Sequence, residues 1–346
     1  MTPRNRVFRA LEFRNPDRAP RDLWALPWVG MFAREPMDAL LRDYPTDFTG
    51  PGAVLAPGKR RQGIEAHKGR YVDDWGCVFE VAEDGVIGEV RDPILDSLRA
   101  IEGYRPPREI MEQADWDAVS RARDANTGGQ ARFLTCGTGI RPFERMQFLR
   151  GSENLYMDLG YGSKELQALL KLIHEFELEL LAEWVQTPAD GLGFMDDWGS
   201  QTGLLISPEM WREIFKPMYA EYCRMIRAAG KKVFFHSDGH IFDIYEDLIE
   251  IGVDAVNSQL FCMDIEEIAR RFKGRITFWG EIDRQHVLPF GSTEDVRRAV
   301  GRIRRALDDG QGGLIAQCEW GVANPPENIR AVYEAWLEPT NALPRD

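Results

Sequence analysis

The stretch VFFHSDGH, residues 233–240, contains the pattern that decides the fold. Three apolar residues are followed at once by a polar run that begins at His236 and ends at His240. A short run of β-branched and aromatic residues is typical of a strand buried on both faces, as the strands of parallel sheets are. We therefore expect a parallel strand here, with polar side chains at its carboxyl end.

The same pattern recurs along the chain, and helical segments separate the apolar runs. Two of these segments open on clear start signals, Ser207-Pro208 and the capping sequence at Ser292. Repeated strand–helix units predict an α/β fold, a (β/α)8 TIM barrel, rather than an open doubly wound sheet. Neither glycine-rich nucleotide-binding motif occurs, which also disfavours the open sheet. An eighth strand is expected between residues 50 and 130, and the other seven are expected near residues 23–26, 133–136, 191–195, 233–236, 255–258, 276–279 and 313–318.

Composition narrows the class of protein and of partner. The chain has 346 residues and a formal net charge of −13. This acidic balance disfavours nucleic acid and anionic membranes as partners. No apolar run approaches the roughly 20 residues of a membrane helix. Five scattered cysteines fit a reducing compartment, so we expect a cytoplasmic protein.

Domain organisation is expected to be simple. We predict one barrel domain over residues 1–346, with an irregular, insertion-rich segment at about 27–130 that is rich in proline, glycine and charge. Short hairpin strands are expected within it at residues 71–76 and 85–90. We interpret this segment as an elaboration over the barrel mouth.

Polar residues follow the predicted later strands. The active site of a (β/α)8 barrel lies at the carboxyl ends of its strands. The residues found there are therefore candidates for substrate binding, and aromatic side chains among them could line an apolar pocket. The predicted substrate-binding residues are Asp196, Asp197, Trp198, His240, Asn257 and Gln259.

A metal site is the most specific hypothesis that these strand ends support. His236 and Asp238 are two residues apart, so both side chains can project into one site. Cys318 follows a late strand among acidic neighbours, and a thiolate with an imidazole and a carboxylate suits zinc. Glu281 is the remaining candidate ligand. The alternatives are a histidine held by an aspartate without metal, a small buried cysteine, and a glutamate that acts as a base or in a salt bridge.

Several segments together resemble the uroporphyrinogen decarboxylase superfamily. They cover nearly the whole chain, and the resemblance implies a (β/α)8 barrel. The segments are NPDRAP (15–20), RPFERMQFLRGSENLYMDL (141–159), FFHSDGHIFDIYEDLIEIGVDAVNSQ (234–259), GEIDRQHVLPFGSTEDV (280–296) and CEWGVANPPENIRAVYEAW (318–336).

The superfamily includes zinc-dependent methyltransferases of corrinoid systems, whose ligands are a His-x-Cys pair and a later Cys. By this resemblance His236 matches the histidine and Cys318 the later cysteine, whereas Asp238 replaces the middle cysteine. The implied metal set is His236, Glu281 and Cys318, with Asp238 as a fourth ligand or as a residue that orients His236. Asp238 and Glu281 are also the expected catalytic residues.

The exchange of a thiolate for a carboxylate predicts the substrate class. It makes zinc a better Lewis acid toward oxygen, which suits a methyl ether as the small-molecule methyl donor. We therefore expect O-demethylation, with methyl transfer to the cobalt of a corrinoid (cobalamin). The chain has no D-x-H-x-x-G corrinoid motif, so a separate corrinoid protein is the expected partner. A homodimer is one assembly that the sequence allows.

Two other functions stay open at this point. One is a metal-free decarboxylase of the uroporphyrinogen type that uses Asp196, Asp197 and Arg18 or Arg21. That family holds substrate carboxylates with paired arginines after the first strand, but residues 23–30 read LWALPWVG here. The other is a non-catalytic barrel that binds a corrinoid or another tetrapyrrole.

Overall fold

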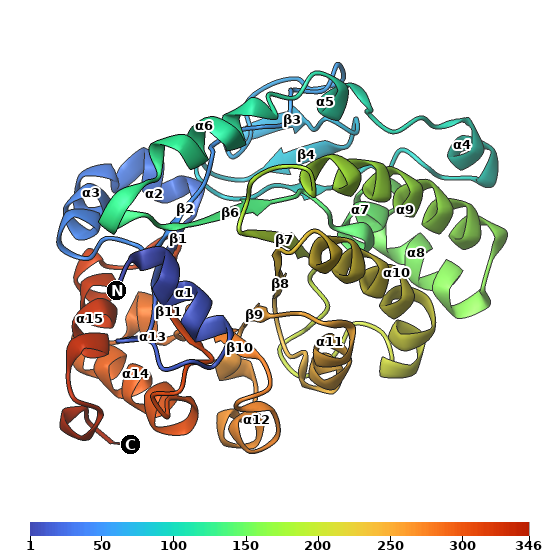
Figure 1. Ribbon diagram of the computed structural model, residues 1–346. Helices are drawn as coiled ribbons and strands as arrows, with labels where there is room; N and C mark the ends of the chain where they lie inside the picture. The colour runs from blue at the N-terminus through green and yellow to red at the C-terminus, as the bar shows by residue number, and fades with distance from the viewer. Residues whose placement is uncertain (346) are drawn as a thin grey trace.

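Eight parallel strands form a nearly closed barrel in the computed structural model, which describes residues 1–345 (Figure 1). Their order around the barrel is β1-β11-β10-β9-β8-β7-β6-β2. The TIM-barrel prediction is confirmed. The strands are β1 (Arg21–Ala25), β2 (Phe48–Thr49), β6 (Phe133–Gly137), β7 (Gly191–Met195), β8 (Lys232–Ser237), β9 (Ala255–Ser258), β10 (Thr277–Trp279) and β11 (Leu314–Trp320).

The seven strands predicted individually are all present, and the eighth differs slightly in position. β2 is only two residues long and begins at Phe48, just before the predicted range. It pairs with β6, but within residues 1–345 it shares no ladder with β1. A backbone hydrogen bond from Asp47 N to Arg21 O, 2.8 Å long, joins the bases of these two segments. The barrel wall therefore has a seam between β1 and β2.

Helices surround the strands, as Figure 1 shows. Several begin at the predicted caps: Ser207 accepts from Met210 N at the start of α10, and Ser292 forms a capping box with Asp295 at the start of α14. The helices that follow β6 are α7 (Pro142–Arg150), α8 (Ser152–Tyr161), α9 (Lys164–Trp184), α10 (Pro208–Ala228), α11 (Tyr245–Ile251), α12 (Ile265–Phe272), α13 (Val287–Phe290), α14 (Thr293–Leu307) and α15 (Pro326–Leu337). Short 3-10 turns lie at Gly128–Gln130, Phe242–Ile244, Leu260–Cys262 and Thr340–Ala342.

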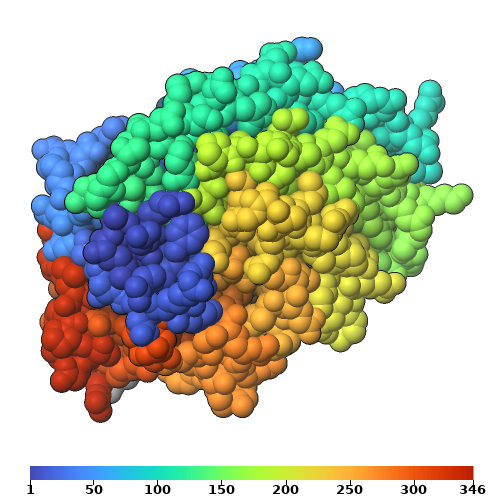
Figure 2. Space-filling view, in the orientation of Figure 1, coloured from blue at the N-terminus to red at the C-terminus, as the bar shows by residue number. Residues whose placement is uncertain are grey.

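The N-terminal helix closes one end of the barrel. α1 (Pro3–Leu11) places Val7 and Leu11 against an inner cluster of barrel side chains that includes Phe133 and Phe234. An ion pair of 2.8 Å between Arg4 and Asp190 fixes the helix to the start of β7. In Figure 2 this dark blue segment lies left of centre on the face seen in that view. The site must therefore open at the opposite end, where the strands terminate.

The segment at about 27–130 packs beside the barrel. Asp73 forms an ion pair of 2.6 Å with Arg145 of α7, and Trp75 contacts Phe176 of α9 edge-on, 4.8 Å between ring centroids. The two strands predicted here overlap the outer strands of a three-stranded antiparallel sheet, whose middle strand at residues 78–81 was not predicted. The elements are α2 (Pro27–Phe32), α3 (Arg34–Asp43), β3 (Gly69–Val72), β4 (Val78–Val81), β5 (Glu89–Val90), α4 (Leu98–Gly103), α5 (Glu109–Glu112) and α6 (Asp117–Ala125). None of the helices in residues 1–345 is long and apolar enough to cross a membrane.

A buried carboxyl group lies between α9 and the barrel. Glu177 accepts hydrogen bonds from Arg141 N at 3.0 Å and from the Tyr222 hydroxyl at 2.8 Å. Burial raises the pKa of Glu177 to about 8. The group thus keeps its proton in the folded state at a pH where it loses the proton in the unfolded chain.

We predict that Glu177→Gln stabilises the protein increasingly as pH rises from 5 to 9. The unfolded wild-type chain ionises Glu177 above about pH 4.3, whereas the folded state does so only near pH 8. Wild-type stability is therefore lost across this window, and the neutral amide avoids the loss, on the order of 3 kcal/mol. Urea unfolding at pH 5, 7 and 9 measures it. Glu175→Gln, on an exposed position of α9, should show no such trend; equal trends would contradict the assignment.

Candidate functional site

Three side chains meet at the open end of the barrel. His236 lies near the end of β8, Asp197 follows β7, and Asp238 follows β8. His236 Nε2 is 3.6 Å from Asp197 Oδ1 and 3.5 Å from Asp238 Oδ1. Both separations exceed the usual length of a hydrogen bond between these atoms. The three side chains therefore face a common point, and the backbone N–H of Asp238 donates to Asp197 Oδ1 at 2.9 Å.

The protonation of the His236 ring follows from its other neighbour. His236 Nδ1 lies 2.6 Å from Asn257 Oδ1, and the Asn257 amide nitrogen donates to the backbone carbonyl of Trp279. Because a carbonyl can only accept, the Asn257 oxygen must be the atom that faces the histidine. His236 Nδ1 is then the donor. In the neutral ring the lone pair is on Nε2, which points toward the two carboxylates.

The three groups fit a divalent cation. Ligands bound to zinc at about 2.0–2.1 Å lie roughly 3.3 Å apart in a tetrahedral site, close to the separations seen here. Asp238 Oδ1 is buried and has no hydrogen-bond partner. Within residues 1–345, Asp197, His236 and Asp238 are the group of His, Cys, Asp and Glu side chains whose ligand atoms all lie within 4.8 Å of one another. Asn257 supplies the outer hydrogen bond that typically orients a ligating histidine.

Arg284 connects this cluster with two further carboxyl groups. It forms an ion pair with Asp238, another with Glu319 at 2.5 Å, and approaches Glu281 Oε2 at 3.9 Å. Glu281 is 2% exposed, and burial raises its pKa well above the ordinary value. Its Oε1 atom has no hydrogen-bond partner. The structure thus places the predicted ligand Glu281 beside the three-residue group and not within it.

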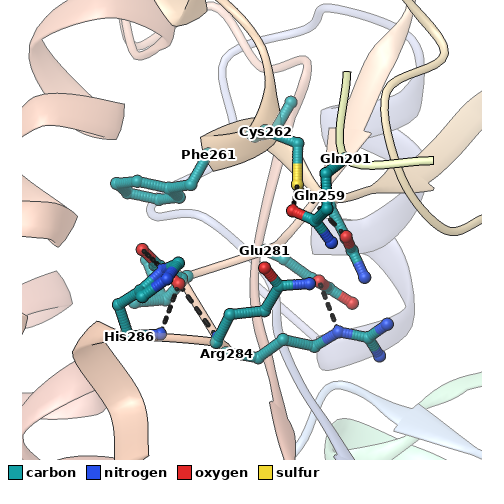
Figure 3. A pocket seen from close by; sticks show the side chains of 11 residues that line it. Gln201, Gln259, Phe261, Cys262, Glu281, Arg284 and His286 are labelled. Atoms are coloured by element: carbon teal, nitrogen blue, oxygen red, sulfur yellow. Dashed lines mark hydrogen bonds and ion pairs between the residues drawn. The ribbon is translucent and has the colours of Figure 1, made fainter. Parts of the chain in front are cut away.

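A polar cavity of about 210 Å³ adjoins Glu281 and Arg284 (Figure 3). Gln201, Gln259 and Cys262 line its opposite side in that view. The Cys262 thiol donates to Gln259 Oε1 at 3.2 Å. Gln259, predicted to bind substrate, therefore lines open space next to the cluster.

Cys318 is not brought into the cluster, which corrects the sequence-based ligand set. Side chains alternate along a strand, and its neighbours on β11, Gln317 and Glu319, face the barrel interior, where they bond Asn257 and Arg284. Cys318 faces outward, is fully buried in the core beneath the helices, and lies beside the Tyr333 hydroxyl. Burial raises the pKa of this thiol to about 12. The alternative of a small buried hydrophobe describes it.

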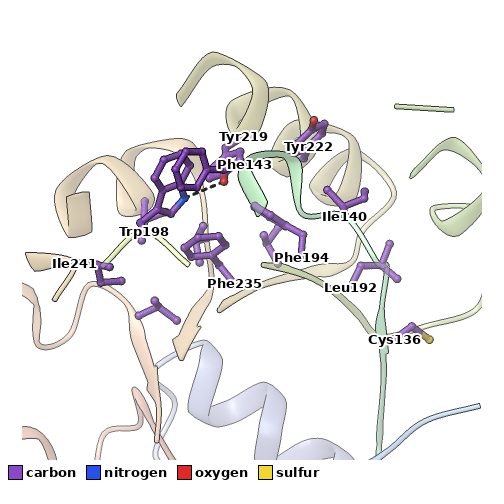
Figure 4. Packing of buried hydrophobic residues seen from close by; sticks show 14 of the residues in the cluster. Cys136, Ile140, Phe143, Leu192, Phe194, Trp198, Tyr219, Tyr222, Phe235 and Ile241 are labelled. Atoms are coloured by element: carbon purple, nitrogen blue, oxygen red, sulfur yellow. Dashed lines mark hydrogen bonds between the residues drawn. The ribbon is translucent and has the colours of Figure 1, made fainter. Parts of the chain in front are cut away.

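Asp196 and Trp198 are also structural rather than substrate-binding. Asp196 is fully buried and accepts from Phe143 N at 2.9 Å and Glu144 N at 2.8 Å, so it caps the start of α7. Trp198 stacks on Phe143 with 4.1 Å between ring centroids and donates to the Tyr219 hydroxyl, as Figure 4 shows. Neither side chain reaches open space.

The other predicted residues divide between support and site. Asn257 is fully buried and hydrogen-bonds to His236 Nδ1, so it orients the His236 ring and does not face open space. His240 is half-buried, and its Nδ1 atom has no hydrogen-bond partner. Asp197, expected to bind substrate, is instead one of the three clustered donors.

Two charged residues at the open end of the barrel, Arg284 and Glu144, were not predicted from the sequence. Arg284 lies three residues after Glu281, but only the fold shows that it pairs with Asp238. Glu144 lies in the first turn of α7, and its buried Oε2 atom, 4.0 Å from the Arg141 guanidinium, has no hydrogen-bond partner. Burial raises the pKa of Glu144, and the positive charge of Arg141 opposes that rise. Nothing in the local sequence around Glu144 indicated the site, since it is brought there by the packing of α7.

The chain is similar to a known protein family. A family model described as uroporphyrinogen decarboxylase (URO-D) matches residues 72–338. The chain belongs to this family. The resemblance noted in the sequence is thereby confirmed, while no curated protein matches the chain.

A solved methyltransferase structure shares the fold of this chain. A methyltransferase from Methanosarcina mazei superposes with a TM-score of 0.71 at 14% identity, covering 97% of this chain and 98% of that one. A glycosylated endo-beta-1,4-xylanase from Gloeophyllum trabeum gives a TM-score of 0.43 at 11% identity, covering 95% and 98%. At such identities the first likeness shows a common fold.

We predict that Cys318→Ala leaves the affinity for Zn²⁺ within twofold of wild type, whereas His236→Ala lowers it at least hundredfold. The reason is that the Cys318 thiol faces the helices, while His236 Nε2 faces the two carboxylates. Isothermal titration of the metal-free protein with Zn²⁺ measures both. Equal losses in the two variants, with unchanged circular dichroism, would restore Cys318 as a ligand.

A second prediction concerns the residue that orients the histidine. Asn257→Leu should weaken Zn²⁺ binding by about 10- to 100-fold, although Asn257 is not a ligand, because the ring and its tautomer are no longer fixed. The same titration tests this. Asp96→Asn, at an exposed position, serves as the control; wild-type affinity in Asn257→Leu would show that the amide does not set the tautomer.

Proposed function

We propose that this protein is a metal-dependent methyltransferase that moves a methyl group from a methyl ether to the cobalt of a corrinoid carried by a separate protein. The observation that carries the proposal is the convergence of His236 Nε2 with the carboxylates of Asp197 and Asp238 at the open end of the barrel. Family membership and the fold shared with a methyltransferase support the reaction class.

The donor set supports oxygen chemistry. A zinc ion held by Asp197, His236 and Asp238 would supply Lewis acidity toward an ether oxygen, since all three donors are nitrogen or oxygen. This differs from the sequence-based set, because the thiolate is absent from the group. Asp238 remains in the proposed set of metal ligands, and Asp197 replaces Cys318 in that set.

Two further residues have roles in this proposal. Burial raises the pKa of Glu281 and so favours its protonated form, which can pass a proton to the departing alkoxide or phenoxide. Arg284 holds Asp238 in position and balances part of the negative charge of Asp238 and Glu319. The cavity beside Glu281 leaves room for the substrate oxygen at this edge of the site.

We predict that the purified protein binds about one equivalent of Zn²⁺ and demethylates a methyl ether when cob(I)alamin is supplied. Asp238→Asn should lower both metal affinity and the rate at least tenfold, because the amide offers a weaker, neutral donor. Elemental analysis, release of the alcohol or phenol, and the absorbance of methylcobalamin measure these outcomes. Asp96→Asn is the matched control.

Other outcomes of this experiment would select a different function. Unchanged activity in a chelator, with no zinc in the fresh protein, would reject the metal-dependent reaction. Turnover of a porphyrinogen under those conditions would indicate the metal-free decarboxylase. Binding of a corrinoid without any turnover, unaffected by His236→Ala, would indicate the non-catalytic barrel.

A further inference from the structure

A bare patch of backbone faces the barrel interior on β6 and β7. Gly137 pairs with Gly193 across these two parallel strands. Leu134, Cys136 and Leu192 point outward into the main core, so alternation directs the two glycines inward. A Cβ atom built on Gly137 would meet no heavy atom within 4 Å, and its backbone is not in the positive-φ region. Because these two residues are glycines and have no side chains, the barrel interior has free space beside them.

This patch forms one side of a cavity of about 600 Å³ in the seam between β1 and β2. Trp24 and Phe48 line the seam, and Trp279 lines its inner side. Trp279 Nε1 donates to Asp22 Oδ2 at 2.9 Å, which fixes the orientation of that indole. A bare backbone wall opposite rigid aromatic rings suits a flat, apolar group.

The cavity borders the His236 cluster through Trp24. The Trp24 ring lies 5.0 Å from the His236 ring and 4.8 Å, edge-on, from the Trp279 ring, measured between centroids. A ring bound between the glycines and Trp24 would thus lie next to the side chain that presents Nε2 to the cluster. The cavity beside Glu281, in contrast, has charged and amide groups as well as Leu260, Phe261 and Ile282 in its lining.

We propose that this seam cavity binds the aromatic ring of an aryl methyl ether and directs its methoxy group toward the His236 cluster. The proposal rests on the proposed function for its methyl-transfer step, and it names the substrate class and the place of the ring. Two observations carry it: an apolar cavity with aromatic walls, and a pair of inward-facing glycines that keep it open. The cavity lining is mainly apolar, and the polar groups available to a ring substituent are Asp22, Thr46, Thr49, Arg132 and Thr135.

The test fills the cavity without touching the cluster. Gly137→Leu should weaken binding of 2-methoxyphenol at least tenfold, and Gly137→Ala about threefold, since each side chain would occupy the space of the ring. Titration calorimetry and ligand-observed NMR on the full chain measure this. Gly160→Leu, at an exposed position where a Cβ also meets nothing within 4 Å, is the matched control and should bind as wild type.

Kinetics separate this inference from the proposed function. With cob(I)alamin, Gly137→Leu should raise the KM for 2-methoxyphenol at least tenfold and leave the KM for 2-methoxyethanol, a methyl ether without a ring, within twofold. Wild-type affinity in folded Gly137→Leu and Gly137→Ala proteins, or no binding of the probe to wild type, would overturn the cavity assignment. Probe binding that depends on Gly137 in a protein without zinc or methyl transfer would reject the methyltransferase and retain the cavity.

Discussion

The alternation of side chains across the barrel wall is the constraint on which the site depends. On β8 it directs His236 inward, and on β11 it directs Gln317 and Glu319 inward and Cys318 outward. A shift of one residue in either strand would exchange these faces. Parallel pairing with the neighbouring strands prevents such a shift, so the cluster is as well defined as the barrel itself.

The positive charge of Arg284 lies among several carboxyl groups at the open end of the barrel. Arg284 contacts Asp238, Glu319 and Glu281, yet one oxygen each of Asp238 and Glu281 stays without a partner. Burying such atoms costs free energy unless a ligand or proton satisfies them. The unpartnered oxygen of Asp238 fits a bound cation, and the raised pKa of Glu281 fits a role as proton donor, which are the two features that the proposed reaction uses.

Two cavities of different character flank this cluster. One is lined by Gln201, Gln259 and Arg284, and the other by Trp24 and inward-facing glycines. The two cavities differ because different strands line them. β9 and β10 end in polar loops, whereas β6 and β7 carry glycines and aromatic rings line the seam beside β1. A substrate with a polar reacting end and an apolar body matches this division.

Much of the fold and part of the site were determined by the sequence alone. Apolar runs bounded by capped helices specified seven strands, and polar residues after them marked the end where His236 and Asp238 meet, because these signals are local. The sequence did not determine that Asp197 joins them, that Asp196 and Trp198 turn into the core, or that Cys318 faces the helices. Those outcomes depend on strand register and helix packing, which bring residues from distant segments together, and only the tertiary structure decides them.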